Sequence, residues 1–215
     1  MKNRAIVLAG PSAAGKTTVM NEMMDRTGTF YFSRSATTRE KRGDAFDNEY
    51  IYLSVDEFKG RIERGEMLEY TFHSGNYYGT PLSEMEYAFE NGKIPLLILD
   101  MNGIESLKKA EGFETLGVYV YENLSVLEKR LFERELIKGE NEAARARYEK
   151  RVEQNRRDYL SLPERAEIFD FMVENVTVKD TATKILDFFS GKTEMSREKI
   201  LKVCHTLKES VKTVK

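Results

Sequence analysis

Residues 10–18 read Gly10-Pro11-Ser12-Ala13-Ala14-Gly15-Lys16-Thr17-Thr18 and match the pattern G-x-x-x-x-G-K-[ST]. The apolar run Ala-Ile-Val-Leu-Ala at 5–9 precedes this stretch and is typical of a buried strand. Apolar side chains recur at helical spacing over 19–24, directly after it. Because a strand, a glycine loop and a helix follow one another in this order, the stretch predicts a phosphate-binding loop.

The residue types in this loop suit an anion. Gly10 and Gly15 let the backbone bend tightly and approach a phosphate without a Cβ in the way. Successive N–H groups and the start of the following helix attract phosphate, and Lys16 adds a full positive charge at the β- and γ-phosphates. The Thr17 hydroxyl is placed to hold Mg²⁺. The alternative interpretation is a glycine turn followed by a solvated lysine.

Composition narrows the class of protein. The chain has 215 residues, with 34 basic and 36 acidic side chains and a net charge of -2, so we expect no nucleic-acid partner. The single Cys204 excludes an intrachain disulfide and fits a reducing compartment. No stretch approaches the roughly 18–20 apolar residues of a membrane span, and the N-terminal apolar run is too short for a signal peptide. We therefore expect a soluble, cytoplasmic protein.

Strand-like segments alternate with amphipathic helices along the chain, which predicts an α/β fold with a parallel sheet covered by helices, of the P-loop NTPase type. The near-continuous apolar run at 94–99 is typical of a strand covered on both faces. Ser83 is expected to cap a helix that ends near Gly92, and Thr177 or Asp180 is expected to open a later helix. The predicted organisation is a core at 1–32 and 92–190, an inserted α+β subdomain at 33–91, a lid at 135–147 and a helical extension at 191–215. The extension could pack on the core or form a homodimer contact.

The inserted subdomain carries a polar, basic loop. Arg39 and Arg42 lie three residues apart, beside Ser35 and upstream of Tyr50. Two guanidinium groups with hydroxyl donors suit a phosphate monoester, which needs charge and several hydrogen bonds. A solvated basic turn is the alternative.

Glu69 and Thr80 point to a base-recognition site. A carboxylate accepts two parallel N–H bonds, which guanine offers on one edge, and a threonine hydroxyl can donate to the guanine carbonyl oxygen. The alternative is an exposed strand carboxylate followed by a tyrosine-glycine turn.

Asp100 ends the most apolar strand. Ligands collect beyond the carboxyl ends of parallel strands, so this aspartate could hold the Mg²⁺ shell or the acceptor. A helix N-cap is the alternative role for the same side chain.

Arginines flank the charged segment expected to form the lid. Arg130 and Arg134 are four residues apart and share one helix face, and Arg147 lies beyond the segment. Such arginines can close over a transferring phosphoryl group and neutralise its charge. A solvated arginine face paired with nearby glutamates is the alternative.

Taken together, these segments resemble guanylate kinase over residues 4–190. The motifs that carry the resemblance are Gly-Pro-Ser-x-x-Gly-Lys-Thr-Thr at 10–18, Ser-x-Ser-Ala-Thr-Thr-Arg-x-x-Arg at 33–42, Leu-Glu at 68–69, Tyr-Tyr-Gly-Thr at 77–80, Leu-Asp at 99–100, Arg-Leu-x-x-Arg at 130–134 and Phe-Asp-Phe-x-Val-x-Asn at 169–175. The resemblance implies transfer of the ATP γ-phosphoryl group to GMP with Mg²⁺, a step of purine nucleotide metabolism. It also implies that the subdomain at 33–91 binds the nucleoside monophosphate.

The resemblance assigns roles by position. It places the GMP phosphate on Arg39, Arg42, Tyr50 and Tyr78, and the guanine side of GMP on Ser35, Glu69, Thr80 and Asp100. It places the transferring group on Lys16, Arg39, Arg130, Arg134 and Arg147, the ATP base near Asn175, and Mg²⁺ on Thr17 and Asp100, directly or through water. ATP itself is assigned to Gly10, Pro11, Ser12, Ala13, Ala14, Gly15, Lys16, Thr17, Thr18 and Asn175.

Some positions depart from the family pattern. Ala13 stands where a glycine is usual, and Lys41 replaces a proline. The short lid leaves the register of Arg147 open against Arg145 and Arg151. The tail beyond residue 190 has no counterpart in the typical member.

Two other functions remain open at this point. A kinase of the same fold could act on another phosphorylated acceptor, such as a different nucleoside monophosphate or a ribose bisphosphate. Glu69 and Thr80 speak against a sugar phosphate, which needs neither side chain. A non-enzymatic binding module of the same fold would typically lose the phosphate loop, whereas Gly15, Lys16 and Thr17 are all present.

Overall fold

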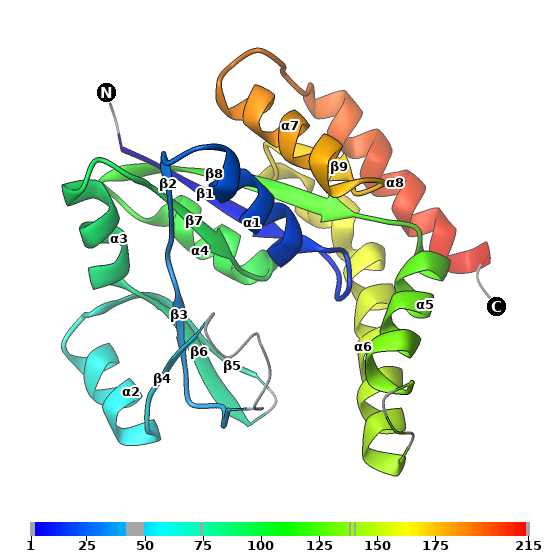
Figure 1. Ribbon diagram of the computed structural model, residues 1–215, viewed down its shortest axis with the longest axis horizontal. Helices are drawn as coiled ribbons and strands as arrows, with labels where there is room; N and C mark the ends of the chain where they lie inside the picture. Colours follow the sequence, from blue (N-terminus) through cyan, green and yellow to red (C-terminus); the bar gives the residue numbers. More distant parts are fainter. Residues whose placement is uncertain (1–2, 42–49, 74, 138, 140, 214–215) are drawn as a thin grey trace. The chain divides into compact units, whose positions relative to one another are not determined.

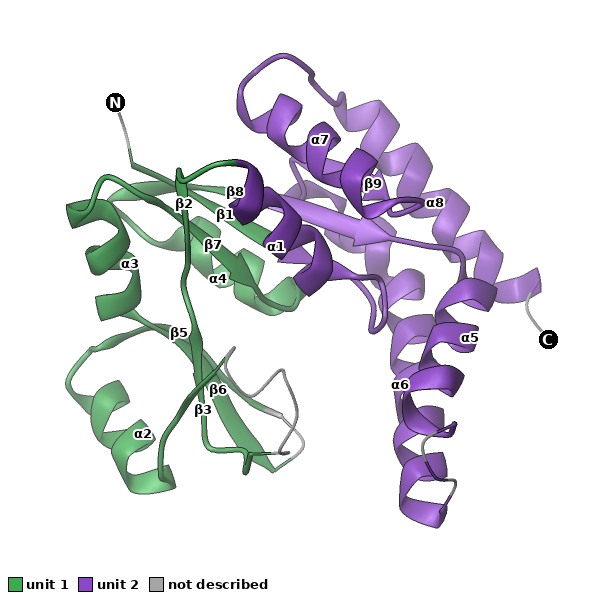
Figure 2. Cartoon of the chain, in the orientation of Figure 1, with its two compact units in different colours: residues 1–7, 27–116 green, residues 8–26, 117–215 purple. Residues whose placement is uncertain are grey.

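The computed structural model describes residues 3–41, 50–73, 75–137, 139 and 141–213. Arg42, a predicted phosphate ligand, therefore lies outside the described residues. The chain divides into two compact units, residues 1–7 with 27–116 and residues 8–26 with 117–215 (Figure 2). The candidate phosphate loop lies in the second unit and the basic loop of the insertion in the first.

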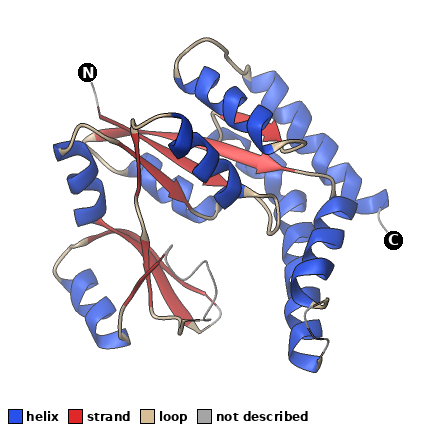
Figure 3. Cartoon of the chain, viewed as in Figure 1, coloured by secondary structure: helices blue, strands red, loops and turns tan. Residues whose placement is uncertain are grey.

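The main sheet has five strands in the order β2-β7-β1-β8-β9. Its strands are β1 (Asn3–Ala9), β2 (Phe30–Phe32), β7 (Ile94–Ile98), β8 (Phe113–Tyr121) and β9 (Phe171–Glu174). Pairing is parallel between β2 and β7 in the first unit and between β8 and β9 in the second. Strands and helices alternate along the chain (Figure 3). The predicted α/β class with a parallel, helix-covered sheet is confirmed.

Apolar runs explain why these strands lie inside. The residues of β1 from Ala5 to Ala9 are fully or almost fully buried, as are Leu96 and Leu97 of β7 and 118–120 of β8. A strand covered by helices on both faces must be apolar at successive positions, rather than at every second one. The loops at the ends of these strands are therefore attached to a closely packed, buried sheet.

The helices of the second unit surround its strands. They are α1 (Lys16–Arg26), α5 (Leu124–Glu135), α6 (Glu142–Ser161), the 3₁₀-helix η2 (Leu162–Ile168), α7 (Val178–Phe189) and α8 (Arg197–Thr213). Helix α1 packs on α7, and α5 lies beside α6 (Figure 1). The segment predicted as a lid, 135–147, comprises the end of α5, a short connection and the first turns of α6.

The C-terminal extension packs on its own unit. Helix α8 contacts α6 and η2 and buries Ile200, Cys204 and Leu207. The guanidinium of Arg197 donates to the carbonyls of Ala166, Glu167 and Phe169, at 2.8 to 3.0 Å. Those bonds satisfy carbonyls at the end of η2, so α8 is anchored where it begins. None of the helices in the described part of the chain is both long and apolar enough to cross a bilayer.

The first unit holds a second sheet, in the order β4-β3-β6-β5. Its strands are β3 (Ser35–Thr37), β4 (Tyr50–Tyr52), β5 (Met67–His73) and β6 (Asn76–Pro81), and the helices of this unit are α2 (Val55–Glu63), α3 (Leu82–Glu90) and α4 (Met101–Lys109). Strands β3 and β4 pair in parallel, whereas β6 pairs antiparallel with both β3 and β5. A Cβ on Gly79 of β6 would lie 2.6 Å from the carbonyl oxygen of Glu69, so only glycine fits there.

Helix starts were predicted with mixed success. Of the two residues expected to open α7, Thr177 is the cap, and its hydroxyl accepts from the backbone N–H of Asp180. The prediction for Ser83 is wrong, because α3 begins at Leu82 with Pro81 at the N-cap and Ser83 lies inside the first turn. Pro81 is the last residue of β6, and its extended backbone leads directly into the helix, which leaves no room for a separate capping residue.

Candidate active site

The phosphate loop has the backbone that its glycines predict. Gly10 and Gly15 have φ values of +148° and +87°. A Cβ on Gly10 would overlap the carbonyl oxygen of Val120, and one on Gly15 would lie 2.5 Å from the side-chain nitrogen of Asn175. Both positions therefore require glycine for conformation and for space.

Ala13 is strained. It is the only non-glycine residue with a positive φ, +67°, in the described part of the chain. The left-handed region costs an L-residue with a Cβ about 1–2 kcal/mol. The loop thus keeps a glycine-like conformation at a position where this chain has a methyl group.

The Lys16 side chain curls back over the loop. Its Nζ donates to the carbonyl oxygens of Gly10 and Pro11, at 2.8 and 2.9 Å. The following helix begins with the bond from the Val19 N–H to the Gly15 carbonyl. The ammonium group and the helix N-terminus therefore lie on the same loop, where both attract an anion.

Two asparagines from other elements hold the loop. Asn155 of α6 accepts from the Ser12 N–H at 2.7 Å and donates to the Ser12 carbonyl at 3.1 Å. Asn175, after β9, donates to the Ala14 carbonyl at 2.7 Å and accepts from the Thr181 hydroxyl at 3.0 Å. Both side chains are buried, with 1% and 4% exposure. The loop is thereby fixed at Ser12 and at Ala14.

Sequence reasoning assigned Asn175 to the ATP base and missed Asn155. A signal for Asn155 existed. It lies three residues after Val152 and four before Tyr159, which is helical spacing, so it is a polar residue on an apolar helix stripe. A buried polar side chain must have a hydrogen-bond partner, and here the partner is the loop backbone.

Arginines of α5 and α6 converge on one carboxylate. Glu135 lies 3.2 Å from Arg134, 3.3 Å from Arg147 and 3.3 Å from Arg151. Burial opposes the charged form of Glu135, but Arg151, Arg134 and the hydrogen bonds from Arg147 and Arg134 outweigh it and lower its pKa. Glu135, which sequence reasoning also missed, therefore holds three guanidinium groups together.

Two of the arginines reach the phosphate loop itself. Arg130 donates to the Ala13 carbonyl at 3.3 Å and pairs with the buried Glu122 at 3.3 Å. Arg151 donates to the Ser12 hydroxyl at 3.4 Å. Arg151, one of the three arginines among which the lid register was open, therefore bonds to the loop.

In the first unit, Arg39 lies among tyrosines. Its guanidinium donates to the Tyr52 hydroxyl and to the Glu40 carbonyl, both at 3.0 Å, and lies over the Tyr50 and Tyr52 rings, 5.4 and 5.6 Å from their centroids. The Tyr50 ring meets the Tyr78 ring edge-on, with centroids 6.3 Å apart. Arg39, Tyr50 and Tyr78, which are all predicted to bind the phosphate, are thus neighbours. Tyr52, which the sequence analysis does not name, lies beside Arg39.

Sheet register explains this grouping. Ser35 pairs with Tyr50 across β3 and β4, and Thr37 pairs with Tyr78 across β3 and β6. Directly opposite residues in a sheet project to the same face. Segments separated by a long stretch of sequence therefore present their side chains together.

Glu69 and Thr80 are also opposite each other, across β5 and β6. The Thr80 hydroxyl, which is fully buried, donates to the Glu69 carboxylate at 2.7 Å. Burial raises the pKa of Glu69; the Thr80 bonds lower it, and the nearby Asp100 charge raises it again, with a net rise. Thr80 therefore orients the carboxylate.

Asp100 caps helix α4. Its Oδ1 accepts from the Gly103 N–H at 2.8 Å, which is the alternative role that the sequence allowed. The second carboxylate oxygen makes no hydrogen bond with any described residue. The described residues contain no group of three or more His, Cys, Asp or Glu side chains that could hold a metal ion. A Mg²⁺ ion at this protein would need a ligand's phosphates for most of its shell.

Comparisons with known proteins agree with this geometry. The guanylate kinase family model matches residues 2–192. Guanylate kinase of Prochlorococcus marinus subsp. pastoris is 35% identical over 194 residues, covering 86% of this chain and 97% of that protein. The enzyme of Chlorobaculum tepidum is 35% identical, covering 87% and 94%.

A solved structure shares the fold. The crystal structure of guanylate kinase from Anaplasma phagocytophilum superposes with a TM-score of 0.65 at 20% identity, covering 91% of this chain and 89% of that one. The family match and the relatives above 30% identity extend over most of the chain, while helix α8 lies beyond the matched residues. The chain belongs to the guanylate kinase family.

Proposed function

We propose that this protein transfers the γ-phosphoryl group of ATP to GMP, giving ADP and GDP. The pairing of Glu69 with Thr80 is the observation that carries the choice of acceptor, because it fixes a part-buried carboxylate in the unit that also holds Arg39 and the tyrosine cluster. A carboxylate for the guanine edge and a cation for a phosphate are what GMP requires.

The donor side rests on the loop at 10–18. Its backbone N–H groups and Lys16 would bind the triphosphate, with Asn175 near the base. When bound, Mg²⁺ would neutralise charge on the β- and γ-oxygens. Thr17 supplies a hydroxyl oxygen at the start of α1, and Asp100 is the proposed acidic partner, directly or through water.

Arginines would stabilise the transferring group. In the proposed reaction a phosphate oxygen of GMP forms a bond to the γ-phosphorus while the bond to the ADP oxygen breaks, and negative charge is carried on the γ-oxygens. We assign Arg130, Arg134 and Arg151 to these oxygens. Arg147 pairs with Glu135, as Arg134 and Arg151 do. Arg134 and Arg151 must exchange Glu135 for phosphate as the site fills, and Arg130 must exchange Glu122.

The acceptor side uses the small sheet. Arg39, Arg42, Tyr50 and Tyr78 would bind the GMP phosphate, and Ser35, Glu69 and Asp100 the guanine. We modify the expected role of Thr80: because its hydroxyl is bound to Glu69, it positions that carboxylate. The domain limits predicted from the sequence and a cytoplasmic location remain part of this proposal.

A coupled assay for ADP release tests the acceptor. Purified protein with ATP and Mg²⁺ should release ADP faster with GMP than with AMP, CMP or UMP. Glu69→Gln should lower kcat/KM for GMP by roughly 10- to 100-fold, because an amide N–H group then faces guanine donors. Faster turnover with any other monophosphate, or an unchanged Glu69→Gln variant, would overturn the proposal.

A further inference from the structure

A cavity of about 440 Å³ lies between the end of β8 and helix α8. Six residues line it: Tyr121, Lys199, Lys202, Val203, Thr206 and Leu207. Five of them come from α8, at spacings of three and four, so they occupy one face of that helix. This size falls within the range of cavities that hold small molecules.

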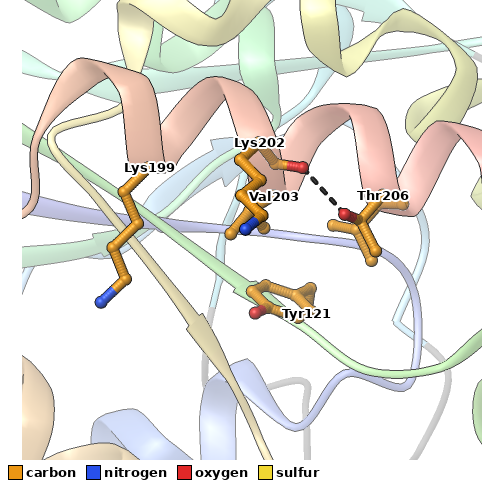
Figure 4. Close-up of a pocket in the computed structure, with 6 residues that line it drawn as sticks. Tyr121, Lys199, Lys202, Val203 and Thr206 are labelled. Carbon is orange, nitrogen blue, oxygen red and sulfur yellow. Dashed lines mark hydrogen bonds between the residues drawn. The ribbon is translucent and has the colours of Figure 1, made fainter.

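Helix α8 is anchored to the unit beside this cavity. Arg197 fixes the start of the helix to η2, and Ile200 and Cys204 are buried on the side that packs against the unit. The Cys204 sulfur lies 3.6 Å from the Met172 sulfur of β9. Arg197, Ile200 and Cys204, which make these contacts, are not among the six residues that line the cavity. Figure 4 shows Tyr121 across from the labelled α8 side chains.

Unpaired polar groups mark this cavity. Among the described residues, neither the Lys199 nor the Lys202 ammonium has an ion-pair partner. Two other basic side chains of α8 are paired, Lys208 with Glu164 and Lys212 with Glu209. Lysines three apart on one helix face repel each other, so an anion between them would relieve that repulsion.

Tyr121 supplies an aromatic wall and a donor. Its hydroxyl makes no hydrogen bond with any described residue. Burial raises the pKa of Tyr121, and the Glu174 and Glu122 carboxylates raise it further, so the phenol stays protonated at neutral pH. Glu122 itself is paired with Arg130. The ring, with Val203 and Leu207, gives an apolar surface on which a planar group can pack.

We propose that α8 and Tyr121 form a binding site for a small aromatic anion, separate from the nucleotide sites. The ring of the ligand lies against Tyr121, Val203 and Leu207, and its phosphate or carboxylate lies between the two lysine ammonium groups. Helix α8 lies beyond the residues matched by the family model, so this site belongs to the extension of this chain.

The probe is 1-naphthyl phosphate, which combines a ring and an anion. The chain has no tryptophan, so naphthyl fluorescence anisotropy can be read without interference from indole. The titration uses the full chain with saturating ADP and GMP, which occupy the proposed nucleotide sites. Anisotropy should rise and saturate. Neutral 1-naphthol and inorganic phosphate should each bind at least about tenfold more weakly, since each lacks half of the contacts.

Matched variants locate the bound probe. Lys199→Ala with Lys202→Ala should weaken binding about tenfold or more, whereas Lys208→Ala with Lys212→Ala removes equal charge from the same helix and should change it less than about threefold. Val203→Phe, which fills the cavity with a ring, keeps both lysines and adds no indole, should abolish binding. Circular dichroism checks that each variant folds.

Three results would overturn the site. They are the absence of saturable binding to the native chain, equal losses in the two double-lysine variants, and unaltered binding to folded Val203→Phe. These outcomes are independent of phosphoryl transfer, because kcat for GMP is measured on the same variants and is expected to stay unchanged.

Discussion

Replacing Asn155 with alanine should weaken ATP binding, although it removes none of the residues assigned to contact the nucleotide. Asn155 makes two hydrogen bonds to the backbone of Ser12, at 2.7 and 3.1 Å, and its side chain is 1% exposed. Each bond contributes about 0.5–1.5 kcal/mol, so the unfolding free energy should fall by about 1–3 kcal/mol. The effect on the ligand has a separate origin.

Without Asn155, the backbone at Ser12 must be ordered when the triphosphate binds. Fixing one residue costs about 1–2 kcal/mol, which corresponds to a 5- to 30-fold loss in affinity. Isothermal titration calorimetry with ADP and kcat/KM for ATP should both show this factor. Asn155→Asp retains the acceptor for the Ser12 N–H, loses the donor and adds negative charge, so its loss should be larger and should depend on salt.

Gln154→Ala is the matched control. Gln154 is the preceding residue of α6, and its exposed amide donates to Asp158 rather than to the loop. The ADP affinity of the Gln154→Ala protein should stay within about twofold of the native value. If Asn155→Ala lost stability but bound ADP as tightly as the native protein, Asn155 would only attach α6, and the positioning role would be refuted.

Three further predictions follow from local geometry. Ala13→Gly removes the strain of a left-handed residue but adds unfolded-state entropy, so a net gain of about 0.5–1 kcal/mol is expected in urea unfolding; a loss would contradict the strain argument. Glu135 has a lowered pKa in the folded chain, so its stabilisation is present above the ordinary glutamate pKa and is lost as pH falls through the folded value. The free energy of unfolding of the native protein should therefore be about 1 kcal/mol higher than that of Glu135→Gln at neutral pH, and the two values should converge in acid. A difference that does not change with pH would count against the arginine cluster. Glu69 has a raised pKa, so it is protonated at a higher pH than an ordinary glutamate. As the pH falls into that range, KM for GMP should rise in the native protein, whereas KM of Glu69→Gln should not change with pH. An identical pH profile in both proteins would remove Glu69 from base recognition.

Local sequence was sufficient where local chemistry sets the structure. The glycines of the loop need positive φ and close approach, and both demands appear in the motif itself. The apolar run at 94–99 needs cover on both faces, which places it inside a parallel sheet. The cap at Thr177 is satisfied within three residues, so it too could be predicted. Ser83 failed because Pro81 already ends a strand at that point.

The amino-acid sequence by itself thus determined the α/β class, the phosphate loop and the residue types that suit GMP. Only the tertiary structure decided the partners of those residues: Asn155 on Ser12, Glu135 among three arginines, and the Thr80 hydroxyl on Glu69. Motif chemistry depends on neighbours along the chain, whereas a side-chain hydrogen bond depends on which distant segments pack together. Ser12 and Asn155 are 143 residues apart in sequence, and no local pattern encodes the 2.7 Å between their atoms.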